Sequence, residues 1–144
     1  MNDKIDSNIH WSFWAISVVA LIWNVMGAMN FFMQMNAEMV ASFPESHRAI
    51  IEGRPLWATT GFAIAVFAGT FAGILLLLKK SVAYYLFVAS LIGTVVTMIH
   101  TINIAVSAIE YNFGEIVMMI LMPLIIAALL VWYTKRAKNK GWIT

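Results

Sequence analysis

Polar side chains interrupt two long apolar runs of this sequence, and they lie at similar depths within those runs. In the first run two asparagines follow a tryptophan, and in the third run amide and hydroxyl residues form one stripe around a histidine. Because an asparagine side chain facing acyl chains is costly, these residues should point toward the interior of a helical bundle. The candidate substrate-binding residues are Trp23, Asn24, Asn30, Thr97, His100 and Asn103.

Two interpretations of these polar stripes are open. The amides and hydroxyls can satisfy one another across two helices and thereby fix how the helices pack. Alternatively, they can line a small solvated cavity that binds a polar solute near the middle of a membrane. Residue types and spacing do not decide between the two, because both interpretations place the same side chains on the same inward faces.

His100 is the one ionisable side chain well inside an apolar run. An ionisable group within a membrane span is by default a functional candidate, and histidine can relay protons near neutral pH. The alternative is a neutral imidazole that is hydrogen-bonded to Thr97, Asn103 or Asn24. The sequence leaves both roles for His100 open.

Missing residue types exclude several kinds of chemistry. The sequence has no cysteine, which excludes disulfide exchange, thiolate metal sites and iron–sulfur clusters. The apolar runs contain no Asp, Glu, Lys or Arg, which disfavours proton exchange on a buried carboxylate, and their one histidine disfavours haem held by two. No phosphate loop, nucleophile elbow or zinc signature occurs. We therefore expect no enzymatic activity, no metal site and no cofactor, and we assign the clustered methionines to packing rather than to Cu(I).

The elements that must position these residues are four apolar runs, at about 11–33, 55–78, 82–107 and 116–133. Of the 144 residues, 62% are hydrophobic, and the mean hydropathy is +0.84. Each run is close to the ~20 residues that a helix needs to cross a bilayer, and only helices satisfy their own backbone there. The sequence predicts an all-α, integral membrane four-helix bundle, with residues 1–144 forming a single domain in a lipid bilayer.

Basic residues predict the orientation of the four spans. With both termini on one side, that side collects Lys4, Lys79, Lys80, Lys135, Arg136, Lys138 and Lys140, whereas the other side keeps Arg48 and Arg54. This bias predicts cytoplasmic N and C termini, with 134–144 as a basic cytoplasmic tail. The basic residues flank the spans and form no stripe for nucleic acid.

The connections between the spans are unequal in length. The turn at 79–81 is tight, so the second and third spans should be antiparallel neighbours. The outer segment 34–54 is long, and it contains signals for a short helix over 43–52. These are a capping box formed by Ser42 and Glu45 and a stop formed by Gly53 and Pro55. Pro123 should bend the fourth span.

Small residues recur every four positions in the second span, at Gly61, Ala65, Gly69 and Gly73. Such a ridge allows another helix backbone to approach closely, which is a main source of helix association in lipid. We expect this ridge to be a packing face, either within the bundle or between subunits. Gly27 should serve the same purpose in the first span.

Four segments carry a resemblance to a known family: LIWNVMGAMNF at 21–31, GRPLWA at 53–58, AIAVFAG at 63–69 and ASLIG at 89–93. They resemble a family of small bacterial four-span membrane proteins that are often labelled sugar transporters. The resemblance implies the four-span fold and a bacterial inner membrane. It also implies sugar binding, for which Trp23 would stack on the ring and Asn24 would bridge hydroxyls. Four helices are few for a transport path, so we expect a homo-oligomer.

Two functional hypotheses follow. The first is a small oligomeric carrier of a small polar or neutral solute, possible substrates including a sugar, with Asn24, Asn30, His100 and Asn103 lining the site. The second is a non-transporting module that binds a larger membrane complex or lipid through the glycine ridge and the outer segment. In the second hypothesis the polar stripes only hold the helices together.

Overall fold

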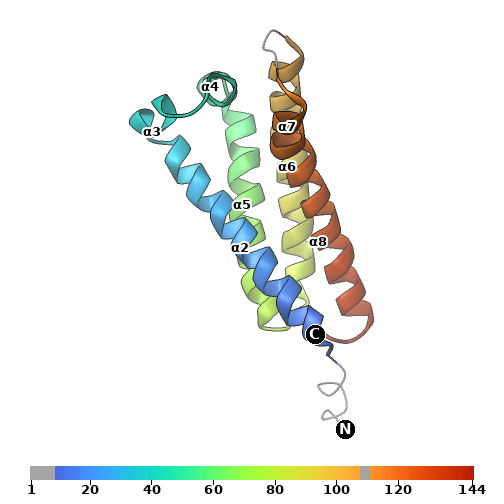
Figure 1. The fold of residues 1–144 in the computed structure, drawn as a ribbon. Coiled ribbons are helices and arrows are strands. Elements are labelled where there is room, and N and C mark those ends of the chain that lie inside the picture. Colours follow the sequence, from blue (N-terminus) through green and yellow to red (C-terminus); the bar gives the residue numbers. More distant parts are fainter. Residues whose placement is uncertain (1–8, 108–110) are drawn as a thin grey trace.

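A computed structural model describes residues 9–107 and 111–144 of the chain, and these residues are helical with no strand among them. Three long helices are α2 (Trp11–Gln34), α5 (Leu56–Leu77) and α6 (Val82–Ser107). A fourth is continuous through α7 (Phe113–Ile116), the π-helical turn η1 (Val117–Leu121) and α8 (Met122–Asn139). Figure 1 shows the four long helices running side by side along the length of the molecule.

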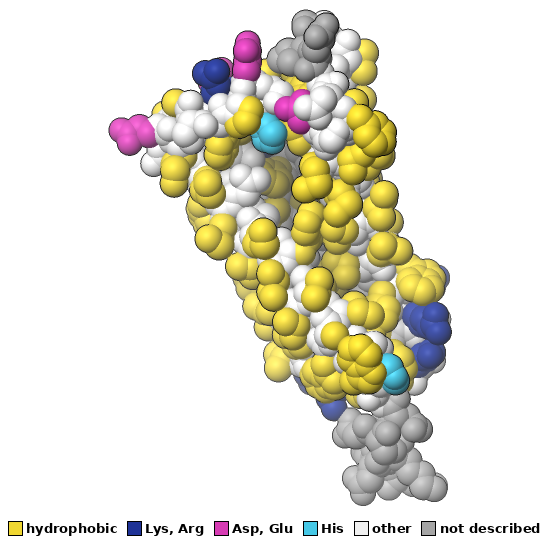
Figure 2. Space-filling model, in the orientation of Figure 1, with side chains coloured by type: hydrophobic (Ala, Val, Ile, Leu, Met, Phe, Trp, Pro, Cys, Tyr) yellow, Lys and Arg dark blue, Asp and Glu magenta, His cyan; other side chains and the backbone are white. Residues whose placement is uncertain are grey.

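The described residues are all-helical, which confirms the all-α class, and each of the four long helices is long and apolar enough to cross a membrane. Large apolar side chains are exposed along all four of them, and Figure 2 shows the side chains covering the flank of the bundle. Charged side chains gather toward its two ends. The fourth helix is longer than the predicted span at 116–133, because it continues into the basic tail as far as Asn139.

The helices pack in the order α2, α5, α6, α8, with α5 and α6 as the central pair. The tight turn between α5 and α6 is present, and Lys79 adopts a positive φ of 56° within it. The two outer helices of this order, α2 and α8, face each other on the same side of the central pair. A cleft lies between them.

One end of the bundle, here called the terminal end, contains the start of α2, the α5–α6 turn and residues 140–144. The last residue closes a clasp on the turn, because Ser81 N donates to Thr144 O at 3.0 Å and Thr144 N donates to Lys79 O at 2.9 Å. Ile143 is buried in the main apolar core. The Trp142 ring packs edge-on against Phe13 of α2, with 6.1 Å between centroids. The terminal end is therefore tightly packed.

The opposite end, here called the roof end, contains two short helices, α3 (Ala37–Ala41) and α4 (Glu45–Glu52). The predicted capping box of Ser42 and Glu45 is wrong. Pro44 occupies the N-cap of α4 with no side-chain cap, and Ser42 ends α3, where its hydroxyl donates to Met39 O at 2.6 Å. A capping box does occur at the start of α7, formed by Asn112 and Glu115.

Pro123 lies directly after the π-helical turn. Its ring nitrogen has no hydrogen to donate to the preceding turn. The wider turn accommodates this loss, since Met122 N donates to Val117 O, five residues back. Such π-helical turns occur often at functional sites. Here the turn places Met118 and Met119 beside the cleft.

Candidate binding cleft

A cavity of about 650 Å³ lies between α2 on one side and η1 and α8 on the other. The facing sides of α5 and α6 form its floor, and residues near the roof end form its mouth. Figure 2 shows this hollow, flanked by yellow apolar side chains and running down from the roof end. Its polar lining residues are Asn24, Asn30, Gln34, His47, Arg54, Ser90, Thr94, Thr97 and Thr101.

The floor depends on close packing between α5 and α6. A Cβ on Gly61 would lie 2.8 Å from Val96 Cγ1, and a Cβ on Gly93 would lie 2.7 Å from the backbone N of Ala65. Gly69 and Gly73 instead face α2, where a Cβ on Gly73 would lie 3.1 Å from Leu21 Cα. The small-residue ridge of α5 is thus occupied within the bundle, by α6 near the roof end and by α2 near the terminal end.

Asn24 is buried against this ridge. Its Nδ2 donates to Ala20 O of the same helix at 2.8 Å. Its Oδ1 occupies the space that a Cβ on Gly69 would need, close to the hydroxyl of Ser90. Asn24 therefore bonds to its own helix rather than to an amide or hydroxyl of α6, although it still borders the cleft.

Three hydroxyl groups of the floor, those of Ser90, Thr94 and Thr101, also have partners within the bundle. Ser90 Oγ donates to Ala65 O at 2.5 Å, which joins α6 to α5. Thr94 Oγ1 donates to Ser90 O at 2.8 Å, and Thr101 Oγ1 donates to Thr97 O at 3.2 Å. Since each hydroxyl has one hydrogen to donate, this part of the floor offers a ligand acceptor lone pairs but no free O–H donors.

The six predicted binding residues are divided by the structure. Trp23, Asn24, Asn30 and Thr97 all line the cleft. His100 and Asn103 are not among the residues that line it. Asn103 is exposed on the outside of α6. His100 is buried, and its partner is none of the three residues considered from the sequence.

His100 bonds to the roof. Its Nε2 lies 3.0 Å from Ile50 O near the end of α4. A carbonyl oxygen only accepts, so Nε2 carries the hydrogen in this contact. The indole of Trp57 packs edge-on against the imidazole, with 6.3 Å between ring centroids. His100 therefore holds α4 against α6 in this structure.

Two further hydrogen bonds hold the other end of α4. Ser46 Oγ donates to Glu115 Oε1 at 2.8 Å, and Tyr111 Oη donates to Ser46 O at 3.1 Å. Burial, with the nearby Glu115 carboxylate, raises the pKa of Tyr111 above its usual value, so its hydroxyl remains a donor. Helix α4 is thus tied to both α6 and α7, and its residues His47 and Ile50 border the mouth of the cleft.

Arg54 and Gln34 are the residues at the mouth that the sequence did not single out. The Arg54 guanidinium lies 5.1 Å above the centroid of the Phe62 ring. Among the described residues neither Arg54 Nε nor Gln34 Oε1 has a hydrogen-bond partner, although both atoms are buried. One signal was available in the sequence, because Arg54 is one of two basic residues on the predicted outer side.

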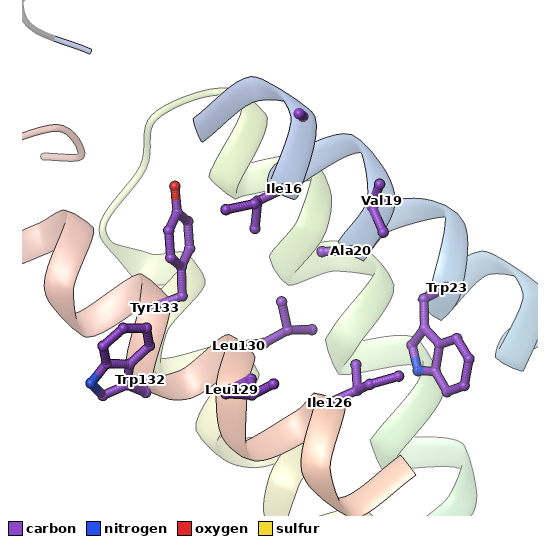
Figure 3. Close-up of a pocket in the computed structure, with 10 residues that line it drawn as sticks. Ile16, Val19, Ala20, Trp23, Ile126, Leu129, Leu130, Trp132 and Tyr133 are labelled. Atoms are coloured by element: carbon purple, nitrogen blue, oxygen red, sulfur yellow. The ribbon is translucent and has the colours of Figure 1, made fainter. Parts of the chain in front are cut away.

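Toward the terminal end the cleft continues as an apolar groove between α2 and α8. Trp23, Ile126 and Leu130 line both parts, so the groove and the cleft are continuous. Figure 3 shows Ile16 and Ala20 of α2 facing Leu130 of α8 across the groove. Tyr133 also borders it, with its hydroxyl buried and without a partner among the described residues.

Methionines dominate the apolar lining of the cleft, at Met26, Met29, Met33, Met98, Met118 and Met119. Their flexible, polarizable side chains adapt to ligands of different shape. No Asp or Glu is among the lining residues. Within residues 9–107 and 111–144, no group of three or more His, Asp or Glu side chains is placed to hold a metal ion.

Comparisons of the chain with protein-family models, curated proteins and solved structures gave no match.

Proposed function

We propose that this chain is a small carrier of the bacterial inner membrane, which holds a small solute in the cleft between α2 and α8. The observation that carries the proposal is the cleft itself, a cavity of about 650 Å³ among four apolar helices. Small-molecule sites typically measure about 300–1,000 Å³. Helices that merely supported one another would fill this space with side chains, because packed interiors leave few voids larger than a water molecule.

The shape of the cleft supports transport over simple storage. The clasp and the buried Ile143 close the terminal end, whereas the mouth lies at the roof end beside α4. This arrangement corresponds to one access state of a carrier, with solute entering at the roof end. A second access state requires α2 or α8 to move. We further propose a homo-oligomer, since four helices are few for a complete path.

The proposed orientation places the terminal end in the cytoplasm, because it carries most of the basic residues. The chain contains no cysteine, so a single introduced cysteine can be labelled without background. Asn139→Cys, at the end of α8, should react with a membrane-impermeant maleimide only after cells are opened. Glu38→Cys, on α3, should react in intact cells once the outer membrane is permeable. The reverse pattern would overturn the orientation.

The solute expected from the sequence is a sugar or another small polar, neutral molecule. Trp23 and Asn30 border the cleft and fit that role. Asn24 Nδ2 instead donates to its own helix, and three of the floor hydroxyls donate within the bundle. The alternative function, an accessory module docking through the glycine ridge, has less support, because the ridge is occupied by α2 and α6.

The cleft can be tested with a matched pair of substitutions on α8. Ala127 lines the cleft, whereas its neighbour Ala128 is exposed on the outside of the helix. Ala127→Trp should fill the cleft and abolish solute binding and uptake, and Ala128→Trp should leave both unchanged. The readouts are ligand-induced thermal stabilisation of the purified protein and uptake into proteoliposomes. Equal activity in both variants would show that the cleft is not the site.

A further inference from the structure

The mouth of the cleft contains a positive charge that has no counter-ion among the described residues. Arg54 is half-buried and lines the cleft, and no residue that lines it is acidic. Its described contacts are the Phe62 ring beneath the guanidinium and a backbone bond from Arg54 N to Ile51 O. Burial lowers the pKa of Arg54 from its ordinary value.

The other basic side chain at the mouth, His47, differs from Arg54. His47 lies close enough to Glu115 for the two side chains to interact electrostatically, so it has an acidic neighbour. Arg54 has no acidic neighbour in the part of the chain that the structure describes, and a half-buried guanidinium favours an anion that accepts its forked N–H donors. Gln34 adds a buried oxygen at the same mouth that has no partner within residues 9–107 and 111–144, which suits a hydroxyl donor on the ligand.

Polarity falls from the cleft to the groove that continues it toward the terminal end. Arg54, His47 and Gln34 lie at the mouth of the cleft, and methionines, an amide and hydroxyl groups line the part below it. The groove beyond Trp23 is lined by aliphatic and aromatic side chains. A free sugar would leave its hydroxyl groups against these apolar walls. A molecule with a polar head and one apolar chain matches the gradient along its whole length.

We propose that the ligand of this cleft is an anionic single-chain amphiphile, with its phosphate or carboxylate head bound by Arg54 and its chain lying between α2 and α8. The inference rests on the proposed function, because it names the class of solute that the carrier holds. The ligand enters at the roof end from the adjacent layer of the bilayer, and its chain then lies in the gap that separates α2 from α8. The glycerol hydroxyl of a lysophospholipid would satisfy Gln34 Oε1.

Four probes separate the parts of this proposal. Lysophosphatidic acid supplies the anionic head and the chain, and lysophosphatidylcholine supplies the same chain with a zwitterionic head. Glycerol 3-phosphate supplies the head alone, and glucose represents a neutral polar solute. Binding of each to the full-length protein in nanodiscs of zwitterionic lipid is measured by native mass spectrometry and by thermal stabilisation.

Two pairs of variants test where the head and the chain of the ligand bind. Arg54→Gln removes the charge at the mouth, and Arg48→Gln is its control, because Arg48 does not line the cleft. Ala127→Trp blocks the path of the chain, with Ala128→Trp as its control. We expect lysophosphatidic acid to bind wild type about tenfold or more tightly than Arg54→Gln, the factor for losing a charged hydrogen bond. The control substitutions should not change its affinity.

Each other outcome overturns the proposal in a distinguishable way. If glycerol 3-phosphate binds as tightly as lysophosphatidic acid, the site holds a free anion. If lysophosphatidylcholine binds wild type equally well, the head charge is irrelevant, and this comparison needs no variant to fold. If glucose alone binds and Ala127→Trp abolishes it, the amphiphile is wrong but the carrier stands. If Ala127→Trp weakens no ligand, the amphiphile and the carrier proposal both fail.

Discussion

Replacing Gly69 with alanine tests how α2, α5 and α6 meet behind the cleft. The added methyl group would overlap Asn24 Oδ1, and it would lie 2.6 Å from Asn24 Cγ and 3.0 Å from Ser90 Oγ. This overlap can be relieved either by a shift of α2 away from α5 or by rotation of the Asn24 side chain. Rotation breaks the bond from Asn24 Nδ2 to Ala20 O, which is 2.8 Å long.

The expected destabilisation follows from these two costs. Inserting a methyl group into a packed site costs about 1–3 kcal/mol. Loss of the Asn24 hydrogen bond adds about 1 kcal/mol. Gly69→Ala should therefore lower the free energy of unfolding by about 2–4 kcal/mol. Asn24→Ala alone should lower it by about 1 kcal/mol, because Ala20 O keeps its bond within the helix.

The double substitution separates this clash from general damage to α5. With Asn24 shortened to alanine, the methyl group at position 69 has room, so the double variant should be about as stable as Asn24→Ala. The coupling energy should then be about 2 kcal/mol or more, within the range measured for residues in contact. Gly73→Ala is the control, since its methyl group would meet Leu21 rather than Asn24.

Unfolding is followed by far-ultraviolet circular dichroism and tryptophan fluorescence during titration of mixed micelles with SDS. Additive effects of the two substitutions, within about 0.5 kcal/mol, would refute the proposed contact. Rescue of Gly73→Ala by Asn24→Ala would refute it as well. Either result would mean that α2 does not approach α5 at Gly69 in the folded protein.

Three further predictions concern the hold on α4, the π-helical turn and the packing of the C-terminal residues. His100→Ala should release α4 from α6 at a cost of about 1 kcal/mol, seen as faster hydrogen exchange in Glu45–Glu52 with little change in α5. Pro123→Ala should allow a regular helix to replace η1, which should raise the melting temperature. The change should also rotate Met118 and Met119 and thereby lower the affinity for ligand. Unchanged affinity would contradict a role for the π-helical turn. Ile143→Ala should cost about 2 kcal/mol or more because Ile143 is 2% exposed, whereas Val106→Ala, at an exposed position, should have little effect.

The long helices were predictable because hydropathy and length are local properties of the sequence. A run of about 20 apolar residues has one stable backbone conformation in lipid, whatever its neighbours are. The capping box at Ser42 was wrong for an equally local reason. Pro44 takes the N-cap position and begins α4 at Glu45, which leaves the Ser42 hydroxyl to end α3 instead.

The partners of the polar residues were not predictable in the same way. His100 bonds to Ile50 O, and a backbone carbonyl is present at every position, so residue types give no indication of it. Gly69 lies so close to α2 that Asn24 Oδ1 already fills the gap between the two helices. The Asn24 amide nitrogen therefore donates to Ala20 O of its own helix. Both outcomes depend on the relative placement of helices, which becomes fixed only when the bundle is assembled.

The cleft itself follows from unequal connections between the helices. A four-residue connection and the clasp by Thr144 hold α5, α6 and the end of α8 together at the terminal end. At the roof end α2 is joined to α5 through two short helices, and this longer path lets the far half of α2 stand away from α8 (Figure 1). The small-residue ridge of α5 does not bring α2 and α8 together, because it is already in contact with α2 and α6. Helix α4 lies within this longer connection and borders the mouth, where bonds from Ser46 and His100 hold it against α7 and α6.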